Sequence, residues 1–274
     1  MSNFIHLHNH SDFSLLDSSQ SIKSILARVK ELGMNSVALT ETNNLFSMIS
    51  FYKQSIQNDI KPILGVEINI EKSNYDKTKV NNNTYQLILL AKNNVGYLNL
   101  MKLVSLGYTK SSTFSPSVSI DLLKEHQKGL IVSSSGLNGE IAHYASNQNY
   151  KEAKNAATKY RNIFNEDFYL EIQNHTLEKE KTATKIIAEI AKELSIPLLA
   201  TNDTHYTYKE DSVDYEVMKC IGLGQHLNSP NKPKILPPEY YIKSAEEMEA
   251  LFLDYPESIK NSVNISNQCN VEIP

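Results

Sequence analysis

Short apolar runs alternate with helix-period segments along nearly the whole chain. The candidate strands are residues 4–7, 36–39, 62–66, 86–90, 130–133, 168–172 and 198–201. Between them, apolar residues recur at helical spacing, most clearly over 22–32, 150–164 and 177–194. Seven βα units in this order predict a parallel sheet with helical crossovers. Periodicity leaves two closures open: a doubly wound open sheet, or a barrel of the TIM type with one strand fewer.

The composition narrows the classes of function. With 274 residues, 41% of them hydrophobic, the chain can bury the core of one large α/β domain. A formal net charge of −4 excludes a generally basic nucleic-acid surface, so any contact with DNA must be a local patch. Only Arg28 and Arg161 are arginines, so a bidentate arginine clamp on phosphates is not expected. The two cysteines, Cys220 and Cys269, lie far apart, which excludes a disulfide framework and fits a reducing compartment.

Other segments of the sequence predict the cellular location of the protein and the positions of its surface loops. The first residues lack a targeting signal and the apolar runs are too short to span a membrane, so we expect a cytoplasmic protein without membrane contact. The polar stretch 74–84 and the Ser/Thr-rich stretch 111–119 are expected to be surface loops. From residue 212 onward the pattern changes to helices and a Pro-rich connection over 230–238.

Three histidines follow the first predicted strand. His6, His8 and His10 are two residues apart, so in an extended segment their imidazoles are expected to face one way. A solvated strand end is the ordinary alternative. Imidazole is the usual protein ligand for zinc, and three in five residues favour a metal or phosphate site.

Other strand ends carry acidic residues and histidines. Each alone is as well explained by a helix cap or a turn. Together they predict a multinuclear hydrolytic site for metal-dependent phosphoester chemistry. These residues are Asp17, Glu41, Glu67, Glu171, His175, Asp203 and His205.

A family resemblance rests on several motifs: FIHLHNHSDFSLLD at 4–17, NLF at 44–46, KPILGVE at 61–67, LAKN at 90–93, GEI at 139–141, ATND at 200–203 and YIKSAEEM at 241–248. Over essentially its whole length the chain resembles the PHP (polymerase and histidinol phosphatase) domain at the N-terminus of the bacterial DNA polymerase III alpha subunit. The resemblance implies a distorted seven-stranded, TIM-like α/β barrel. We therefore expect a single domain, residues 1–274, with the barrel over about 1–210 and a helical tail over 211–274 that leads toward a polymerase core.

The resemblance also implies a set of metal ligands. His8, His10, Glu67 and Asp203 match the ligands of a first metal. Asp17 and His205 match ligands of another metal, and Glu41 is a further candidate. No catalytic residue can be assigned.

Three family ligand positions are changed in this chain. Thr42 and Gln86 stand where the family has histidines, and Gly136 stands where it has a cysteine. Only the first site remains complete. The sequence therefore predicts one divalent metal at most, zinc or manganese, in a partly degenerate centre.

Three functions from different classes follow. The favoured one is a structural module of a replicative DNA polymerase that holds a separate proofreading exonuclease, with the rest of the alpha subunit as partner and with DNA reached through the parent polymerase. This segment alone is expected to lack polymerase activity and to have weak or no exonuclease activity. The alternatives are a working metal-dependent 3′–5′ exonuclease and, less favoured because of the tail, a free-standing phosphatase.

Overall fold

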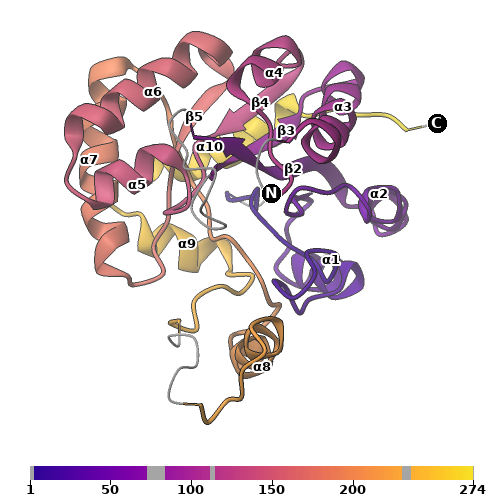
Figure 1. Cartoon of the computed structure of the whole chain (residues 1–274). Coiled ribbons are helices and arrows are strands. Elements are labelled where there is room, and N and C mark those ends of the chain that lie inside the picture. Colours follow the sequence, from indigo (N-terminus) through magenta and orange to yellow (C-terminus); the bar gives the residue numbers. More distant parts are fainter. Residues whose placement is uncertain (1–2, 73–83, 112–114, 230–235, 274) are drawn as a thin grey trace.

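The computed structural model describes residues 3–72, 84–111, 115–229 and 236–273 (Figure 1). In these ranges one curled sheet is formed by β1 (Ser36–Leu39), β2 (Lys61–Glu71), β3 (Thr84–Ala91), β4 (Leu130–Ser133), β5 (Phe168–Ile172) and β6 (Leu198–Ala200). The helices are α1 (Ile22–Glu31), α2 (Met48–Gln57), α3 (Asn94–Lys110), α4 (Ile120–Glu125), α5 (Glu140–Ser146), α6 (Tyr150–Phe164), α7 (Glu178–Leu194), α8 (Ser212–Gly222), α9 (Ala245–Leu251) and α10 (Pro256–Gln268). Two 3₁₀ turns are η1 (Asn165–Asp167) and η2 (Lys209–Asp211). Most of the predicted loop 74–84, and parts of 111–119 and 230–238, lie outside the described residues.

The strands are hydrogen-bonded in the order of the sequence, from β1 to β6. The pairs β1–β2, β4–β5 and β5–β6 are parallel, whereas β3 is antiparallel to both β2 and β4. The prediction of an all-parallel sheet is therefore wrong at β3. Antiparallel neighbours need no helical crossover, and no helix separates β2 from β3 among the described residues. The α/β class is confirmed, with a mixed sheet.

The first predicted strand, 4–7, is an extended segment and not an assigned strand. Together with the residues that follow it, up to His10, its backbone still bonds on both sides: Ala38 N donates to His6 O, and Thr204 N donates to His8 O. The segment thus lies between β1 and the residues that follow β6. The described residues contain six strands where seven were predicted, so a complete seven-stranded barrel stays a prediction.

Local signals explain where the helices begin and end. α1 follows Ser21, whose side chain accepts a hydrogen bond from Ser24 N, and it stops before Gly33, whose φ of +68° suits a glycine. α9 starts with a capping box of Ser244 and Glu247. The helix predicted over 150–164 has the bounds of α6.

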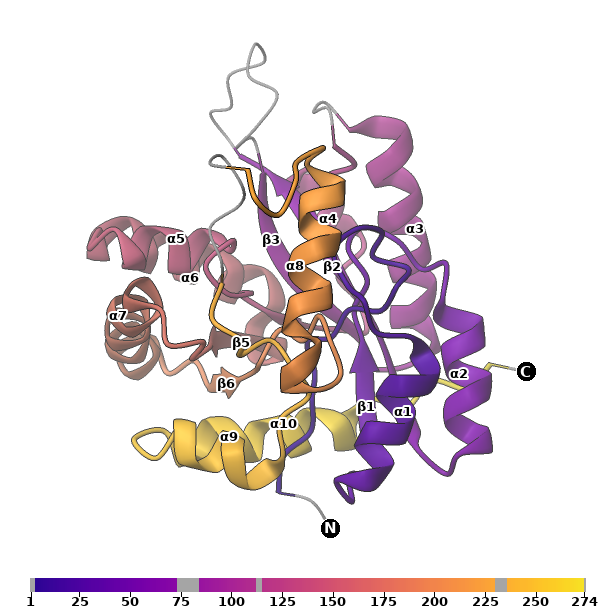
Figure 2. The ribbon, with the colours of Figure 1, turned by 90° about the horizontal axis from the view of Figure 1, so that it is seen from below.

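The interior of the curled sheet is closed at one end by α10. Ile265 and Cys269 join the apolar cluster that fills this interior. Polar contacts fix the helix to the first residues of two strands: Ser266 Oγ lies 2.8 Å from Ser36 Oγ, and Lys61 Nζ donates to Ser266 O. Because Ser36 and Lys61 begin β1 and β2, α10 covers the amino ends of these strands, as Figure 2 shows. The carboxyl ends are left for the polar side chains described next.

Candidate metal centre

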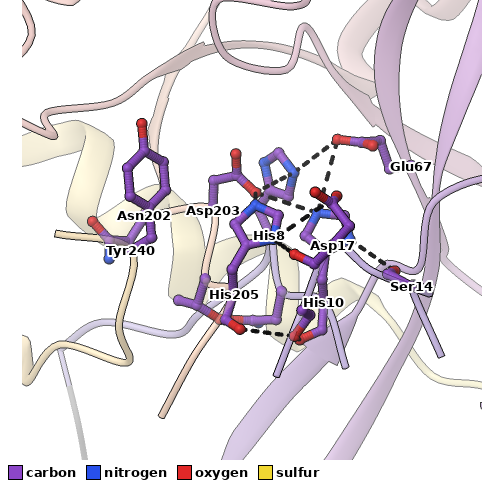
Figure 3. A network of polar contacts seen from close by, with 12 residues as sticks. His8, His10, Ser14, Asp17, Glu67, Asn202, Asp203, His205 and Tyr240 are labelled. Atoms are coloured by element: carbon purple, nitrogen blue, oxygen red, sulfur yellow. Dashed lines mark hydrogen bonds and ion pairs between the residues drawn. The ribbon is translucent and has the colours of Figure 1, made fainter. Parts of the chain in front are cut away.

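Five side chains of metal-ligand type converge at the carboxyl ends of the strands (Figure 3). His8 and His10 belong to the extended N-terminal segment, Glu67 lies in β2, and Asp203 and His205 follow β6. Two overlapping groups, His8–His10–Glu67 and His10–Asp203–His205, each have ligand atoms within 4.8 Å of one another. We call these five residues the histidine–carboxylate cluster.

The distances within the cluster suit a single metal ion. Oδ1 of Asp203 lies 3.2 Å from Nε2 of His8, 3.2 Å from Nε2 of His10 and 3.1 Å from Nε2 of His205. Oε2 of Glu67 lies 3.3 Å from Nε2 of His8 and 3.8 Å from Nε2 of His10. Two tetrahedral ligands of zinc, each about 2.0–2.1 Å from the ion, are about 3.3 Å apart. The two imidazoles and two carboxylates of the predicted first site therefore fit one divalent ion.

His8 is oriented by a carboxylate behind it. Its Nδ1 lies 2.8 Å from Oε1 of Glu171, a fully buried residue of β5, so its Nε2 faces the cluster. Glu171 is held in turn by the hydroxyls of Ser133 and Thr201. Burial alone would lower the pKa of His8, but Asp203 and Glu171 raise it well above its usual value. A histidine ligand backed by a carboxylate is a common arrangement in metal sites.

His10 is oriented by a serine. The hydroxyl of Ser14 donates to Oε2 of Glu41 at 2.5 Å, so the same oxygen must accept the hydrogen bond from Nδ1 of His10 at 3.2 Å. In the neutral ring this leaves the lone pair on Nε2, which faces Asp203. His10 Nε2 and Asp203 Oδ1 are both buried without a hydrogen-bond partner among the described residues. A bound cation would satisfy both atoms.

His205 is placed by the loop that carries Asp17. Its Nδ1 donates to the main-chain oxygen of Asp17, so its Nε2 is directed toward Asp203. Burial alone would lower the pKa of His205, but Asp203 and Asp17 raise it to about 9. Burial alone would raise the pKa of Asp203, but His8 and His205 hold it well below its usual range. The Asp17 carboxylate itself pairs with Lys219 at 2.5 Å.

Two of the changed ligand positions point into the cluster as hydrogen-bond donors. Thr42 Oγ1 donates to Oε1 of Glu67 at 3.1 Å, and Gln86 Nε2 donates to the same oxygen at 2.8 Å. These contacts occupy the Glu67 oxygen that does not face His8. Thr42 and Gln86 therefore satisfy this carboxylate oxygen by hydrogen bonding.

The third changed position, Gly136, lies against Gln173. A Cβ atom added to Gly136 would be 2.0 Å from Oε1 of Gln173. The amide of Gln173 donates to Glu171 at 2.9 Å and lies 3.4 Å from Nδ1 of His8. The space beside Gly136 is thus taken by a side chain that supports His8.

Three other candidates from the sequence lie outside the cluster. Glu41 is enclosed by the hydroxyls of Ser11, Ser14 and Ser47. The expectation that His6 faces the same way as His8 and His10 is wrong: its ring packs on Phe4 and its Nε2 bonds to Lys243 O, because the segment does not continue as a regular strand. His175 bonds to Glu180 and stacks on Tyr240. The three residues are buried parts of the scaffold.

The loop that carries Asp203 is anchored to the segment before α9. Asn202 Nδ2 donates to the main-chain oxygens of Glu239 and Tyr241. Asn202 Oδ1 lies 3.2 Å from Nζ of Lys243, a lysine with only 2% of its surface exposed. His205 N donates to Tyr240 O at 2.8 Å. Part of the predicted tail therefore positions two ligands of the cluster.

Comparison with known proteins identifies the family. The profile of the PHP domain matches residues 6–175. The chain belongs to the PHP domain family. Its relatives include the DNA polymerase III subunit alpha of Campylobacter jejuni, 38% identical over 283 residues, and that of Helicobacter pylori strain 26695, 40% identical over 280 residues. These alignments cover 100% and 98% of this chain but only 24% and 23% of the relatives, so the chain spans about a quarter of their length.

Solved structures resemble this PHP domain more distantly. A two-domain protein of Bacteroides vulgatus that contains a predicted PHP-like metal-dependent phosphoesterase aligns with 98% of this chain and 70% of its own, at 12% identity and a TM-score of 0.49. An amidohydrolase of Chromobacterium violaceum aligns with 90% of this chain and 96% of its own, at 10% identity and a TM-score of 0.46. No helix in the described part of the chain has the length and apolarity needed to cross a membrane.

Sequence reasoning missed three residues around the centre of this PHP domain. They are Gln173, Lys219 and Lys243. Lys219 and Lys243 lie in the part of the chain expected to be a tail, where a lysine normally marks a solvated surface. The only signal was for Lys243, which falls within the motif at 241–248 that carries the resemblance.

Proposed function

We propose that this chain is the PHP domain of a DNA polymerase III alpha subunit and that it serves DNA replication mainly as a structural module. Its proposed task is to hold the proofreading exonuclease subunit beside the rest of the alpha subunit, with DNA bound through the whole polymerase. On this proposal residues 1–274 form one domain, and a cytoplasmic location stays a prediction. The relatives' name, carried over the full length of this chain, supports the proposal.

The observation that carries the structural role is the state of Glu67. Its Oε1 accepts hydrogen bonds from Thr42 and Gln86, at the positions where the family resemblance implies histidine ligands. Phosphoester hydrolysis by paired metals needs cations on both the attacking and the leaving oxygen. A centre in which neutral donors occupy one oxygen of Glu67 is suited to binding one ion and not to hydrolysis by two metals.

We propose that the remaining ion is zinc or manganese, held by His8, His10, Glu67 and Asp203, with His205 close to it. The convergence of three Nε2 atoms on Asp203 supports this set. Such an ion would add positive charge between the carboxylates of Glu67 and Asp203 and stabilise the fold by mass action. Ligation by Asp17, and by Glu41 in its serine enclosure, is not part of the proposal.

The second candidate is an active metal-dependent 3′–5′ exonuclease. The observation in its favour is the same buried, oriented set of imidazoles, since a single complete site is the core of such a centre. It differs from the first candidate in one measurable property, the turnover of DNA 3′ ends.

Three assays on the purified chain test the proposal. With zinc or manganese present, 3′-labelled single-stranded DNA should remain intact, and a primed template should not be extended. Size-exclusion chromatography with the purified exonuclease subunit of the same organism should show a complex. Rapid degradation by the unmodified chain that His8→Ala abolishes would establish the exonuclease instead, and the absence of a complex would contradict the docking role.

A further inference from the structure

Lys219 contacts the rim of the metal centre from α8. Its Nζ lies 2.5 Å from Oδ1 of Asp17, although the two residues are 202 positions apart. Asp17 is next to the cluster, because its Oδ2 lies 3.9 Å from Nδ1 of His205. Within the described ranges, no other lysine or arginine forms an ion pair with Asp17 or with a carboxylate of the cluster. The centre thus has one ammonium group, and a distant helix supplies it.

The helix that carries Lys219 is fixed against the centre by packing. The ring of Tyr215 lies 5.4 Å from the ring of His205, centroid to centroid. At the other end of α8, Leu16 lies so close to Gly222 that a Cβ added there would be 3.2 Å from the Cβ of Leu16. Figure 2 shows α8 (orange) in front of the strands. A packed helix therefore places Lys219 beside Asp17.

The pair is partly shielded from water. The side chains of Lys219 and Asp17 are 35% and 34% exposed. The cation that the protein itself places beside the Asp17 carboxylate is therefore the Lys219 ammonium.

Glu67 shows a parallel arrangement on the other side of the centre. Its Oε1 is satisfied by Thr42 and Gln86, two neutral donors. Asp17 has the ammonium of Lys219 in the corresponding role. In both cases a group of the chain donates hydrogen bonds to a carboxylate oxygen that would suit a metal ion.

We propose that Lys219 is a built-in cation that takes the place of a divalent ion at Asp17 and thereby limits the centre to one bound metal. The ammonium competes for the Asp17 oxygen that a metal ion would approach to about 2.0–2.2 Å, and its positive charge repels a second cation at the other oxygen of the same carboxylate. The inference rests on the proposed single-ion centre and adds the residue that excludes a second ion at Asp17.

The test counts manganese ions per chain. Lys219→Met removes the ammonium and keeps most of the apolar stem. Equilibrium dialysis against Mn²⁺, followed by elemental analysis, should show one more ion per chain in Lys219→Met than in the unmodified protein. Lys154→Met is the matched control, because Lys154 forms an equally short ion pair, 2.5 Å, with Glu193 on the surface of α6 and α7. This control should leave the count unchanged.

Further variants assign the added ion to Asp17. The double variant Lys219→Met/Asp17→Asn should return to the count of the unmodified protein, and electron paramagnetic resonance of Lys219→Met should show spin-coupled manganese that the double variant lacks. Lys219→Gln, which keeps a polar end, replaces Lys219→Met if circular dichroism shows that the methionine variant is unfolded.

The outcomes separate this inference from the proposed function. One ion in the unmodified chain and one in the folded Lys219 variants would overturn the role of Lys219 and leave the single-ion centre intact. No ion in the unmodified chain, with one gained through Asp17 in Lys219→Met, would support Lys219 and contradict the single-ion centre.

Discussion

The two sides of the metal centre satisfy their polar atoms in different ways. On the side of His8, His10 and His205, each imidazole bonds through Nδ1 to an acceptor of the protein and turns Nε2 inward. On the side of Thr42 and Gln86, protein donors occupy the carboxylate oxygen directly. We call these the open side and the filled side. On the open side the inward-facing atoms could bind a cation, whereas on the filled side the carboxylate oxygen already accepts two hydrogen bonds.

The free-energy cost of a buried polar atom without a partner explains why a cation should bind on the open side. A buried polar atom without a partner costs about 1–3 kcal/mol. His10 Nε2 and Asp203 Oδ1 are such atoms on the open side, so a bound ion gains their interaction energy. On the filled side a metal would first have to displace existing hydrogen bonds. On the filled side Oε1 of Glu67 therefore has two donors, whereas on the open side His10 Nε2 and Asp203 Oδ1 still lack a partner among the described residues.

The largest effect should come from removing a ligand of the open side. His10→Ala deletes the Nε2 atom that faces Asp203, and we expect zinc affinity to fall by at least about 100-fold, near 2.7 kcal/mol. Gln86→Met on the filled side should change it by less than about threefold. Competition with a fluorescent zinc chelator measures both. Equal losses in the two variants would remove the distinction between the sides.

A carboxylate behind the open side should have the next largest effect. Glu171→Gln keeps the shape of the side chain but loses the charge that orients His8, and such changes lower metal affinity about 10–100-fold. Glu140→Gln is the matched control, because the Glu140 carboxylate is also largely buried but bonds to Lys159 and Tyr160 and not to a residue of the cluster. Both variants should lose stability in urea, whereas only Glu171→Gln should bind zinc more weakly. A similar loss of affinity in Glu140→Gln would show that Glu171 acts through general stability and not by orienting His8.

The packing of Gln173 on Gly136 predicts a coupled effect on stability. Gly136→Ala should destabilise the protein by about 1–3 kcal/mol, because the added Cβ meets the amide of Gln173. In a Gln173→Ala background the same change should cost less. Urea unfolding of the two single variants and the double variant measures the coupling, and strictly additive values would show that Gln173 simply moves aside.

The contact between Gln173 and Gly136 should also limit any attempt to introduce the three ligands that the family resemblance implies. Thr42→His, Gln86→His and Gly136→Cys together should add little metal while Gln173 fills the space beside residue 136. Adding Gln173→Ala to this triple change should raise the metal content measured by elemental analysis. If the triple change alone takes up the full complement of metal, the filled side is closed by ligand identity and not by packing.

Sequence patterns predicted this fold where local chemistry decides the structure. The apolar run at 130–133 and the periodic segment at 150–164 have the bounds of β4 and α6. The direction of β3 could not be read, because an apolar run of that length is the same in a parallel and an antiparallel strand. The segment 4–7 could not be separated from a strand, since it is extended and bonded but too irregular to be assigned as one.

The site was predictable to the extent that its motifs are local. His8, His10, Asp203 and His205 stand out as histidines and carboxylates at strand ends. Lys219 could not be found in this way, since it reaches Asp17 through the packing of a helix 202 positions away. Gln173 needed the coordinates too, because its role depends on the missing side chain of Gly136.

The smallest effect should come from the hydroxyl of Thr42 on the filled side. Thr42→Val replaces the donor to Glu67 by a methyl group of nearly the same shape, and we expect a loss of about 1 kcal/mol in the free energy of unfolding. The loss is modest because Gln86 still donates to the same oxygen. Thr42→Ser, which keeps the hydroxyl, should cost less than Thr42→Val in urea unfolding. Zinc affinity should stay within about threefold in both variants. A tenfold drop in zinc affinity with Thr42→Val would mean that the hydroxyl itself binds the ion, and Thr42 would then belong to the open side.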